Sequence, residues 1–145
     1  MLPDSIVPEL VTVPFSKDDV YLGLAEVSGL AKVTKDGLIL EFETKESVTG
    51  SGFLKSPIKT VVIPLDEVES VTLKTTLVGA GLTICTRTLE RLKDVPGSHQ
   101  GQIRLGIARK DRSKAERFVS TVNVYQSENE LRKIQSRLNP SSDTD

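Results

Sequence analysis

The stretch Ile63-Pro-Leu-Asp-Glu-Val-Glu-Ser-Val-Thr-Leu-Lys74 (IPLDEVESVTLK) ends one strand-like segment and begins another almost at once. Pro64 cannot donate a hydrogen bond to a sheet, so we expect the first strand to end there. Asp66 can accept backbone hydrogen bonds at the start of one helical turn, and residues 68–74 then alternate as a second strand. The stretch therefore predicts a corner, after which the second strand pairs beside the first. Two apolar residues are expected to fill the core at the bend: Leu65 and Val68.

Including the strands at this corner, the apolar pattern predicts six or seven strands in consecutive hairpins. Val20–Val33 reads as one long strand with a bend at Ser28-Gly29. Lys35-Asp36-Gly37 predicts a tight turn, because Asp-Gly tolerates the positive φ of hairpin turns. The other strands expected are Leu38–Glu43, Lys59–Ile63, Gly81–Thr86 and Gln102–Ala108. The long connections are a loop at 45–58 and a segment at 87–100 with a helical turn near Thr88–Leu92.

The periodicity changes after the last strand. Ser113-Lys-Ala-Glu116 is a capping box, and apolar residues then recur on one helical face as far as Tyr125. The β-branched residues in this run lower helix propensity, so a strand at 117–125 is the alternative. Ser127-Glu-Asn-Glu130 is a second capping box, followed by apolar residues out of phase with the first stripe. A kink or a second short helix is therefore expected around this set: Leu131, Ile134 and Leu138.

A chain of 145 residues suits one domain. We place that domain at 19–126, after an extended N-terminal arm (1–18) whose prolines disfavour helix. A short helical extension (127–138) and a polar tail that is expected to be disordered (139–145) follow it. The fold class expected is mostly β with one C-terminal α-helix.

This order of motifs resembles the pleckstrin-homology-like (PH-like) superfold, and specifically the bacterial PH-like and GRAM-like domains. The resemblance is carried by Thr34–Phe42 (TKDGLILEF), by the corner Ile63–Lys74 and by the run Ile103–Val119, and it covers about residues 20–126. It implies a strongly bent antiparallel sheet, or partly open barrel, capped by an amphipathic helix. An unrelated small β-barrel with a C-terminal helix is the alternative. Because a fold does not give a function, the resemblance implies only a binding role for lipids, proteins or other copies.

Catalysis finds little support in the sequence. Cys85 and His99 flank the end of one predicted strand, so a Cys–His pair is conceivable, but no third group or oxyanion motif accompanies it. One histidine and one cysteine cannot form a zinc site without carboxylates from elsewhere. Val78-Gly-Ala-Gly81 lacks the helix and lysine of a nucleotide loop. We therefore expect a non-enzymatic protein without a cofactor, metal or small-molecule substrate.

Charge is unevenly distributed along the chain. The net charge is −1, but residues 1–72 hold 6 lysines and 12 acids, whereas residues 73–145 hold 13 basic residues and 8 acids. Chance together with one basic helix is the favoured explanation of the asymmetry, and the alternative is that acidic and basic faces attract one another between copies. Glu41 and Glu43 disfavour phosphoinositide binding at the first hairpin. The absence of tryptophan and the 4% aromatic content disfavour nucleic acid.

Two segments are candidates for partner or membrane contact. In the 45–58 loop, apolar Phe53 and Leu54 are flanked by Lys55 and Lys59, and could enter an anionic membrane surface, anchor in a neighbouring subunit or fold back. The basic tract Arg104–Arg117 is the second, unless it is simply a solvated helix face. Its candidate contact residues are Arg109, Lys110 and Arg112.

We thus expect a protein-binding or self-associating module, with peripheral membrane contact as the alternative. No signal-like N-terminus and no apolar run of about 18 residues is present, which favours a bacterial cytoplasmic location.

Overall fold

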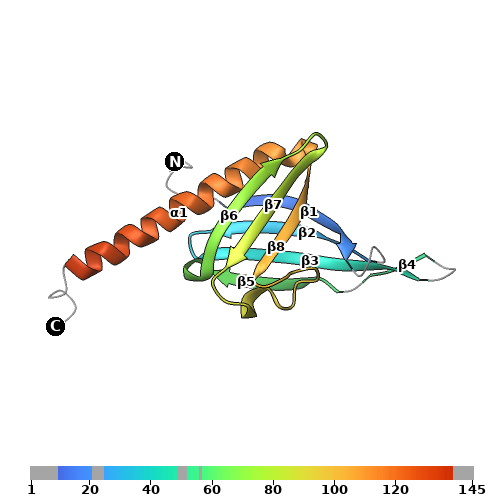
Figure 1. Ribbon diagram of the computed structural model, residues 1–145, viewed down its shortest axis with the longest axis horizontal. Coiled ribbons are helices and arrows are strands. Elements are labelled where there is room, and N and C mark those ends of the chain that lie inside the picture. Colours follow the sequence, from blue (N-terminus) through green and yellow to red (C-terminus); the bar gives the residue numbers. More distant parts are fainter. Residues whose placement is uncertain (1–9, 21–24, 49–51, 56, 139–145) are drawn as a thin grey trace, which may run out of the picture.

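The computed structural model describes residues 10–20, 25–48, 52–55 and 57–138 (Figure 1). Within these residues, eight strands form one antiparallel sheet, against which a single long α-helix packs. The strands are β1 (Val11–Val20), β2 (Ala25–Thr34), β3 (Gly37–Val48), β4 (Gly52–Lys55), β5 (Lys59–Pro64), β6 (Val68–Thr75), β7 (Gly79–Thr86) and β8 (Gln102–Ala108). The helices are the 3-10 turns η3 (Leu65–Glu67), η4 (Glu90–Leu92) and η5 (Arg109–Asp111), and α1 (Arg112–Leu138). The expected mostly β fold with one C-terminal helix is confirmed, and β1 and β4 are strands that were not expected. The expected single strand Val20–Val33 is wrong, because Val20 ends β1 and pairs with Ala25 of the antiparallel strand β2.

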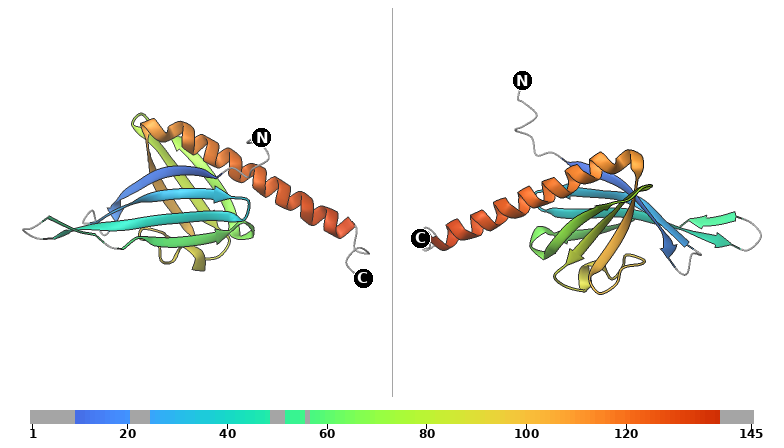
Figure 2. Two further views of the ribbon diagram at one scale, coloured as in Figure 1. Left: turned by 180° about the vertical axis from the view of Figure 1, so that it is seen from behind. Right: turned by 45° about the horizontal axis from the view of Figure 1, so that its top comes forward.

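The sheet is strongly curved and does not close on itself (Figures 1 and 2). Its strand order is β4-β3-β2-β1-β8-β7-β6, and β5 pairs with β3 beside this path. Among the described residues, neither β5 nor β6 has a second strand neighbour. The connection at 87–100 lies at this gap: η4 contacts β5, and the side chains of Leu92 and Val95 are buried. A loop, and not a strand pair, therefore covers the opening of the sheet.

The expected pairing of the two strands at the corner is wrong. β5 pairs with β3, and β6 pairs with β7. Hairpin turns fold the chain back through residues with positive φ, whereas Pro64 is extended (φ −56°, ψ 146°) and is followed by the right-handed turn η3. The corner therefore passes the chain from one half of the sheet to the other.

The sheet begins earlier than residue 19. In place of an arm, residues 11–18 belong to β1, which pairs with β2 from Val11 opposite Val33 onwards. Alternate residues of β1 point inward, and Val13 and Phe15 are buried. Pro14 is tolerated although β1 lies between two strands, because the pairing with β8 is described only at Ser16 opposite Gly106.

The expected 45–58 loop is largely a hairpin. β3 continues to Val48, and its last residues pair with β4. This β3–β4 hairpin extends beyond the body of the sheet (Figure 1). Residues 49–51, which connect β3 to β4 in the chain, lie outside the described residues, as do residues 1–9 of the expected arm and the expected tail at 139–145.

Two glycines allow close approach of neighbouring backbones. The turn at Lys35-Asp36-Gly37 is confirmed: Gly37 pairs with Thr34 and has φ 149°. Gly29 lies within β2, where the register with β3 is unbroken, so the expected bend does not interrupt the pairing. A Cβ on Gly29 would overlap the carbonyl oxygen of Glu41. Glycine is thus required there by contact between the strands.

The helix α1 is continuous over 27 residues, about 40 Å at 1.5 Å per residue. Its first half covers the sheet core with Ala115, Phe118 and Val122, all fully buried. The alternative of a strand at 117–125 is wrong, and so is the expected kink or separate helix at 127–138. Burial of one apolar face against the sheet outweighs the weak propensity of the β-branched residues. The second half of α1 projects past the sheet (Figures 1 and 2).

Candidate interaction surfaces

The corner that decides the fold is also a polar junction. Leu65 and Val68 are buried there, as predicted. The backbone N–H of Leu65 donates to the carbonyl of Asp36 at 2.9 Å, which ties the corner to the β2–β3 turn. With both apolar residues turned inward, the acidic side chains between them, Asp66 and Glu67, are left on the outside of the corner.

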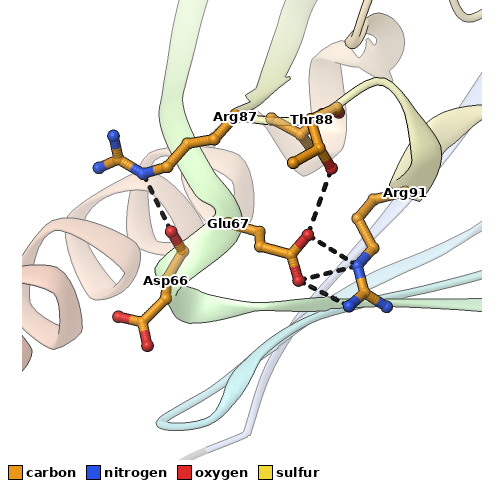
Figure 3. Close-up of polar contacts among 6 residues, drawn as sticks. Asp66, Glu67, Arg87, Thr88 and Arg91 are labelled. Atoms are coloured by element: carbon orange, nitrogen blue, oxygen red, sulfur yellow. Dashed lines mark hydrogen bonds and ion pairs between the residues drawn. The ribbon is translucent and has the colours of Figure 1, made fainter.

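Glu67 binds the connection at 87–100 (Figure 3). The Nε of Arg91 donates to both of its carboxylate oxygens, at 2.9 and 2.8 Å, and the Oγ1 of Thr88 donates to one at 3.2 Å. The backbone N–H of Arg87 donates to the Glu67 carbonyl at 2.8 Å. The hydrogen bond from Arg91 lowers the pKa of Glu67 below its usual value. These contacts hold the loop that covers the β5–β6 gap.

Asp66 binds the helix. Its Oδ1 accepts a hydrogen bond from Asn129 at 2.7 Å and lies 2.8 Å from the Nζ of Lys133. The hydrogen bond from Lys133, followed by that from Asn129, lowers the pKa of Asp66, and the same pair raises the pKa of Lys133. Gln126 donates to the carbonyl of Val68 at 3.0 Å. Polar side chains on one face of α1 therefore fix its projecting half to the corner.

The opposite face of the projecting half is apolar and exposed. Successive helical residues are separated by about 100°, so Leu131 lies about 160° around the helix from Lys133 or Asn129. We call this face the outer stripe, and its residues are Val124 (52% exposed), Leu131 (55%), Ile134 (47%) and Leu138 (74%). Because α1 does not kink, the out-of-phase apolar residues cannot reach the sheet.

A second apolar feature lies at the other end of the helix. Leu77 and Val78, at the turn between β6 and β7, are 93% and 86% exposed, and we call this pair the β6–β7 tip. The guanidinium of Arg112 donates to the carbonyls of Thr76 at 2.8 Å and Gly79 at 3.0 Å, so it fixes the two ends of the turn.

The predicted contact residues are distributed over separate elements. Arg109 and Lys110 are exposed in η5, directly after Ala108, which pairs with Gly79 at the base of the tip. Arg112 is half-buried and bound to the β6–β7 turn, so its role here is structural. Lys59 is exposed on β5. The side chains of three further candidates on β4 lie outside the described residues: Phe53, Leu54 and Lys55.

Groups with chemical reactivity are poorly arranged. The Sγ of Cys85 lies 3.8 Å from the amide oxygen of Gln102, and His99 exchanges backbone hydrogen bonds with that same glutamine. No hydrogen bond joins Cys85 to His99 in the described part of the chain. In those residues no cluster of histidine, cysteine and acidic residues could hold a metal, and no helix has the length and apolar character to cross a bilayer.

Sequence reasoning missed two features. The sequence around the β6–β7 tip was considered as a nucleotide loop and rejected, although two adjacent large apolar residues between strands are a usable signal for a contact site. The polar junction gave no local signal, because Asp66 and Lys133 are far apart in the chain. Glu41, which disfavours phosphoinositide binding at the first hairpin, forms an ion pair with Lys32 across β2 and β3.

Comparison with known proteins gave no match: no family model, no curated protein and no solved structure resembles this chain at a significant level.

Proposed function

We propose that this chain is a non-enzymatic, PH-like binding module that mediates protein–protein contact or self-association. The single observation that carries the proposal is the outer stripe, four aliphatic side chains that remain about half or more exposed on one rigid helical face. Contiguous exposed apolar patches mark contact sites in folded proteins. Burial of such side chains by a partner contributes a favourable term of about 25 cal/mol per Å² of apolar surface, from which the entropic costs of association are subtracted.

The strand arrangement supports the PH-like part of the proposal. Two groups of antiparallel strands meet at a corner, β1 pairs with a strand of each group, and a C-terminal helix packs on the resulting curved sheet. The resemblance implies a strongly bent antiparallel sheet capped by a C-terminal helix, and the curved sheet with α1 packed on it agrees with that part of it.

The anchoring of the helix supports contact through the outer stripe. The projecting half of α1 is bound to the corner on the face opposite the outer stripe, through Gln126, Asn129 and Lys133. The stripe therefore lies on a helix that is already ordered. A partner therefore does not bear the entropic cost of ordering the helix. An amphipathic helix that binds along its apolar face is a common mode of protein recognition.

Photo-crosslinking in cells tests this function. A benzophenone amino acid at Leu131 should give a covalent adduct with a protein, whereas the same group at Arg132, one residue along and off the stripe, should not. If neither position gives a protein adduct, the proposed contact through the outer stripe is wrong.

Peripheral contact with an anionic membrane is the second candidate, and the β6–β7 tip favours it. A protruding apolar pair, Leu77 and Val78, lies beside exposed Arg109 and Lys110. Each basic residue near an anionic bilayer contributes about 1 kcal/mol of attraction, and apolar tips enter the interface. The β3–β4 hairpin with Phe53 and Leu54 would be an additional contact. Sedimentation with anionic vesicles tests this candidate: the protein should sediment with the vesicles if it contacts membranes, and should stay in the supernatant if it does not.

A further inference from the structure

We infer that the outer stripe pairs with the outer stripe of a second copy, with the two α1 helices antiparallel. The inference rests on the proposed function, since it names the partner and geometry of that same surface. It is drawn from the spacing of the stripe, the charges beside it and the side of the helix that the sheet occupies.

The spacing is that of a helix-pairing seam. Val124, Leu131 and Leu138 are seven residues apart, and Ser127 and Ile134 repeat at the same interval three residues later. Apolar residues that alternate at intervals of three and four pack as knobs into the holes of a second helix. All of the large members of this series are exposed in the single chain.

The charges beside the seam favour the antiparallel direction. Glu130 and Arg137 lie on the same flank of the stripe, seven residues apart, and Glu128 and Gln135 lie on the other flank. In an antiparallel pair each flank faces its own equivalent, so Glu130 lies opposite Arg137 of the second copy, and this contact occurs twice. In a parallel pair the two different flanks meet, and Glu130 faces Gln135 of the second copy without an opposite charge.

The fold leaves room for this arrangement. The sheet packs on the face of α1 that carries Phe118 and Val122, and Lys133 continues this face to the corner. Since the outer stripe lies on the opposite face, two helices can meet with both sheets turned outward. The register that places Leu131 opposite Ile134 of the second copy also places Ser127 opposite Leu138 of the second copy.

The seam covers only about two heptads, so the dimer should be weak and its population should rise with protein concentration. The ion pairs at its edges should make it weaker at high salt. Glu130→Arg and Arg137→Glu should each shift the sedimenting species towards monomer, whereas the double variant should restore the dimer because the opposite charges meet again.

Disulfide trapping distinguishes the direction of the helices. In a Cys85→Ser background, Ser127→Cys and Leu138→Cys are made in separate chains. In the antiparallel pair the same position in two copies is about 11 residues, or about 16 Å, apart along the helix, too far for a disulfide, whose Cα atoms lie within about 7 Å. Under mild oxidation, neither variant alone should form a disulfide-linked dimer, but a mixture of the two variants should.

A mixture of Leu138→Cys with Ser136→Cys, which lies off the stripe, controls for random collision. The antiparallel mixture should form at least about tenfold more disulfide dimer than this control, because pairing raises the effective concentration of the two thiols. Dimers of Ser127→Cys or Leu138→Cys with themselves would establish a parallel pair and overturn the inference. No trapping above the control would also overturn it. If no trapping is seen, a photo-adduct of Leu131 with another protein would still support the proposed function. If that photo-adduct is also absent, both the helix pair and the proposed function are wrong.

Discussion

Lys133, on the projecting half of α1, lies 2.8 Å from Asp66 at the β5–β6 corner. The acid that ends one strand group thus holds the helix 67 positions later in the chain, at the point where α1 leaves the sheet. Asn129 binds the same carboxylate oxygen of Asp66. Since Asp66 lies where the chain passes between the two halves of the sheet, its side chain links both halves to the exposed helix.

Asp66→Ala should loosen the projecting half of α1. The variant removes the carboxylate that binds both Asn129 and Lys133. Amide exchange at 126–138 should therefore become about two- to fivefold faster, as expected for the loss of exposed ionic contacts. Hydrogen exchange with mass spectrometry measures this. Glu130→Ala, which removes the 3.7 Å contact of Lys133 within the helix and leaves Asp66 in place, is the control, measured in protein dilute enough to be monomeric. Equal protection in Asp66→Ala and the unmodified chain would show that the junction does not hold the helix.

Glu67 should make the fold sensitive to acid. Its pKa in the folded chain is lowered from 4.5 by Arg91, so the unfolded chain binds a proton more readily and stability rises with pH across this range. The stabilisation is complete well above pH 4.5 and is lost as the pH falls through the folded pKa.

Urea unfolding at several pH values checks this. Glu67→Gln should be less stable than the unmodified chain at neutral pH, and the difference should shrink as the pH falls below 4.5. Glu69→Gln, on the exposed side of β6, is the control for loss of a surface carboxylate that does not bind Arg91. A Glu67→Gln difference that stays constant from neutral to acidic pH would contradict the assignment.

Gly29→Ala should destabilise the sheet. The new methyl group would overlap the backbone of β3 at Glu41, and overpacking of this kind costs about 1–3 kcal/mol. Gly81→Ala is the matched control, because its Cβ would meet the side chain of Arg104, which is exposed and able to move. Chemical denaturation of both variants provides the measurement, and equal stabilities would refute the backbone contact.

Two substitutions on the same helix should differ sharply in stability. Phe118→Ala removes a fully buried ring, which costs about 3–5 kcal/mol. Leu131→Ala truncates an exposed residue of the outer stripe, and in dilute protein it should change the free energy of unfolding by about 0.5 kcal/mol or less. A large loss for Leu131→Ala at low concentration would mean that the stripe contacts its own domain.

The membrane candidate predicts a specific pattern of vesicle binding. Leu77→Ser with Val78→Ser should weaken sedimentation with phosphatidylserine vesicles about tenfold or more, because two apolar side chains no longer enter the interface. Phe53→Ala with Leu54→Ala tests the β3–β4 hairpin in the same way, and neutral vesicles are the control. Equal affinity of all variants, or no binding by the unmodified chain, would end this candidate.

Local sequence patterns predicted the structure correctly where it depends on residues that are close together in the chain. The Asp-Gly turn, the buried Leu65 and Val68 and the helical face up to Val122 were predicted, because each depends on residues a few positions apart. Strand pairing at the corner was predicted wrongly. Which strand lies beside β5 depends on the curvature of the whole sheet, and β3 occupies that place.

The sequence by itself determined the alternation of strands, the position of the corner and the presence of two apolar stripes on the C-terminal helix, since periodicity is a property of neighbouring residues. Only the tertiary structure decided what those stripes face. The helix continues unbroken from the sheet, so the first stripe is buried and the second points to solvent. The same folding brings Asp66 to Lys133 and leaves Leu77 and Val78 at a tip, because contacts between distant segments arise only once the core has set their positions.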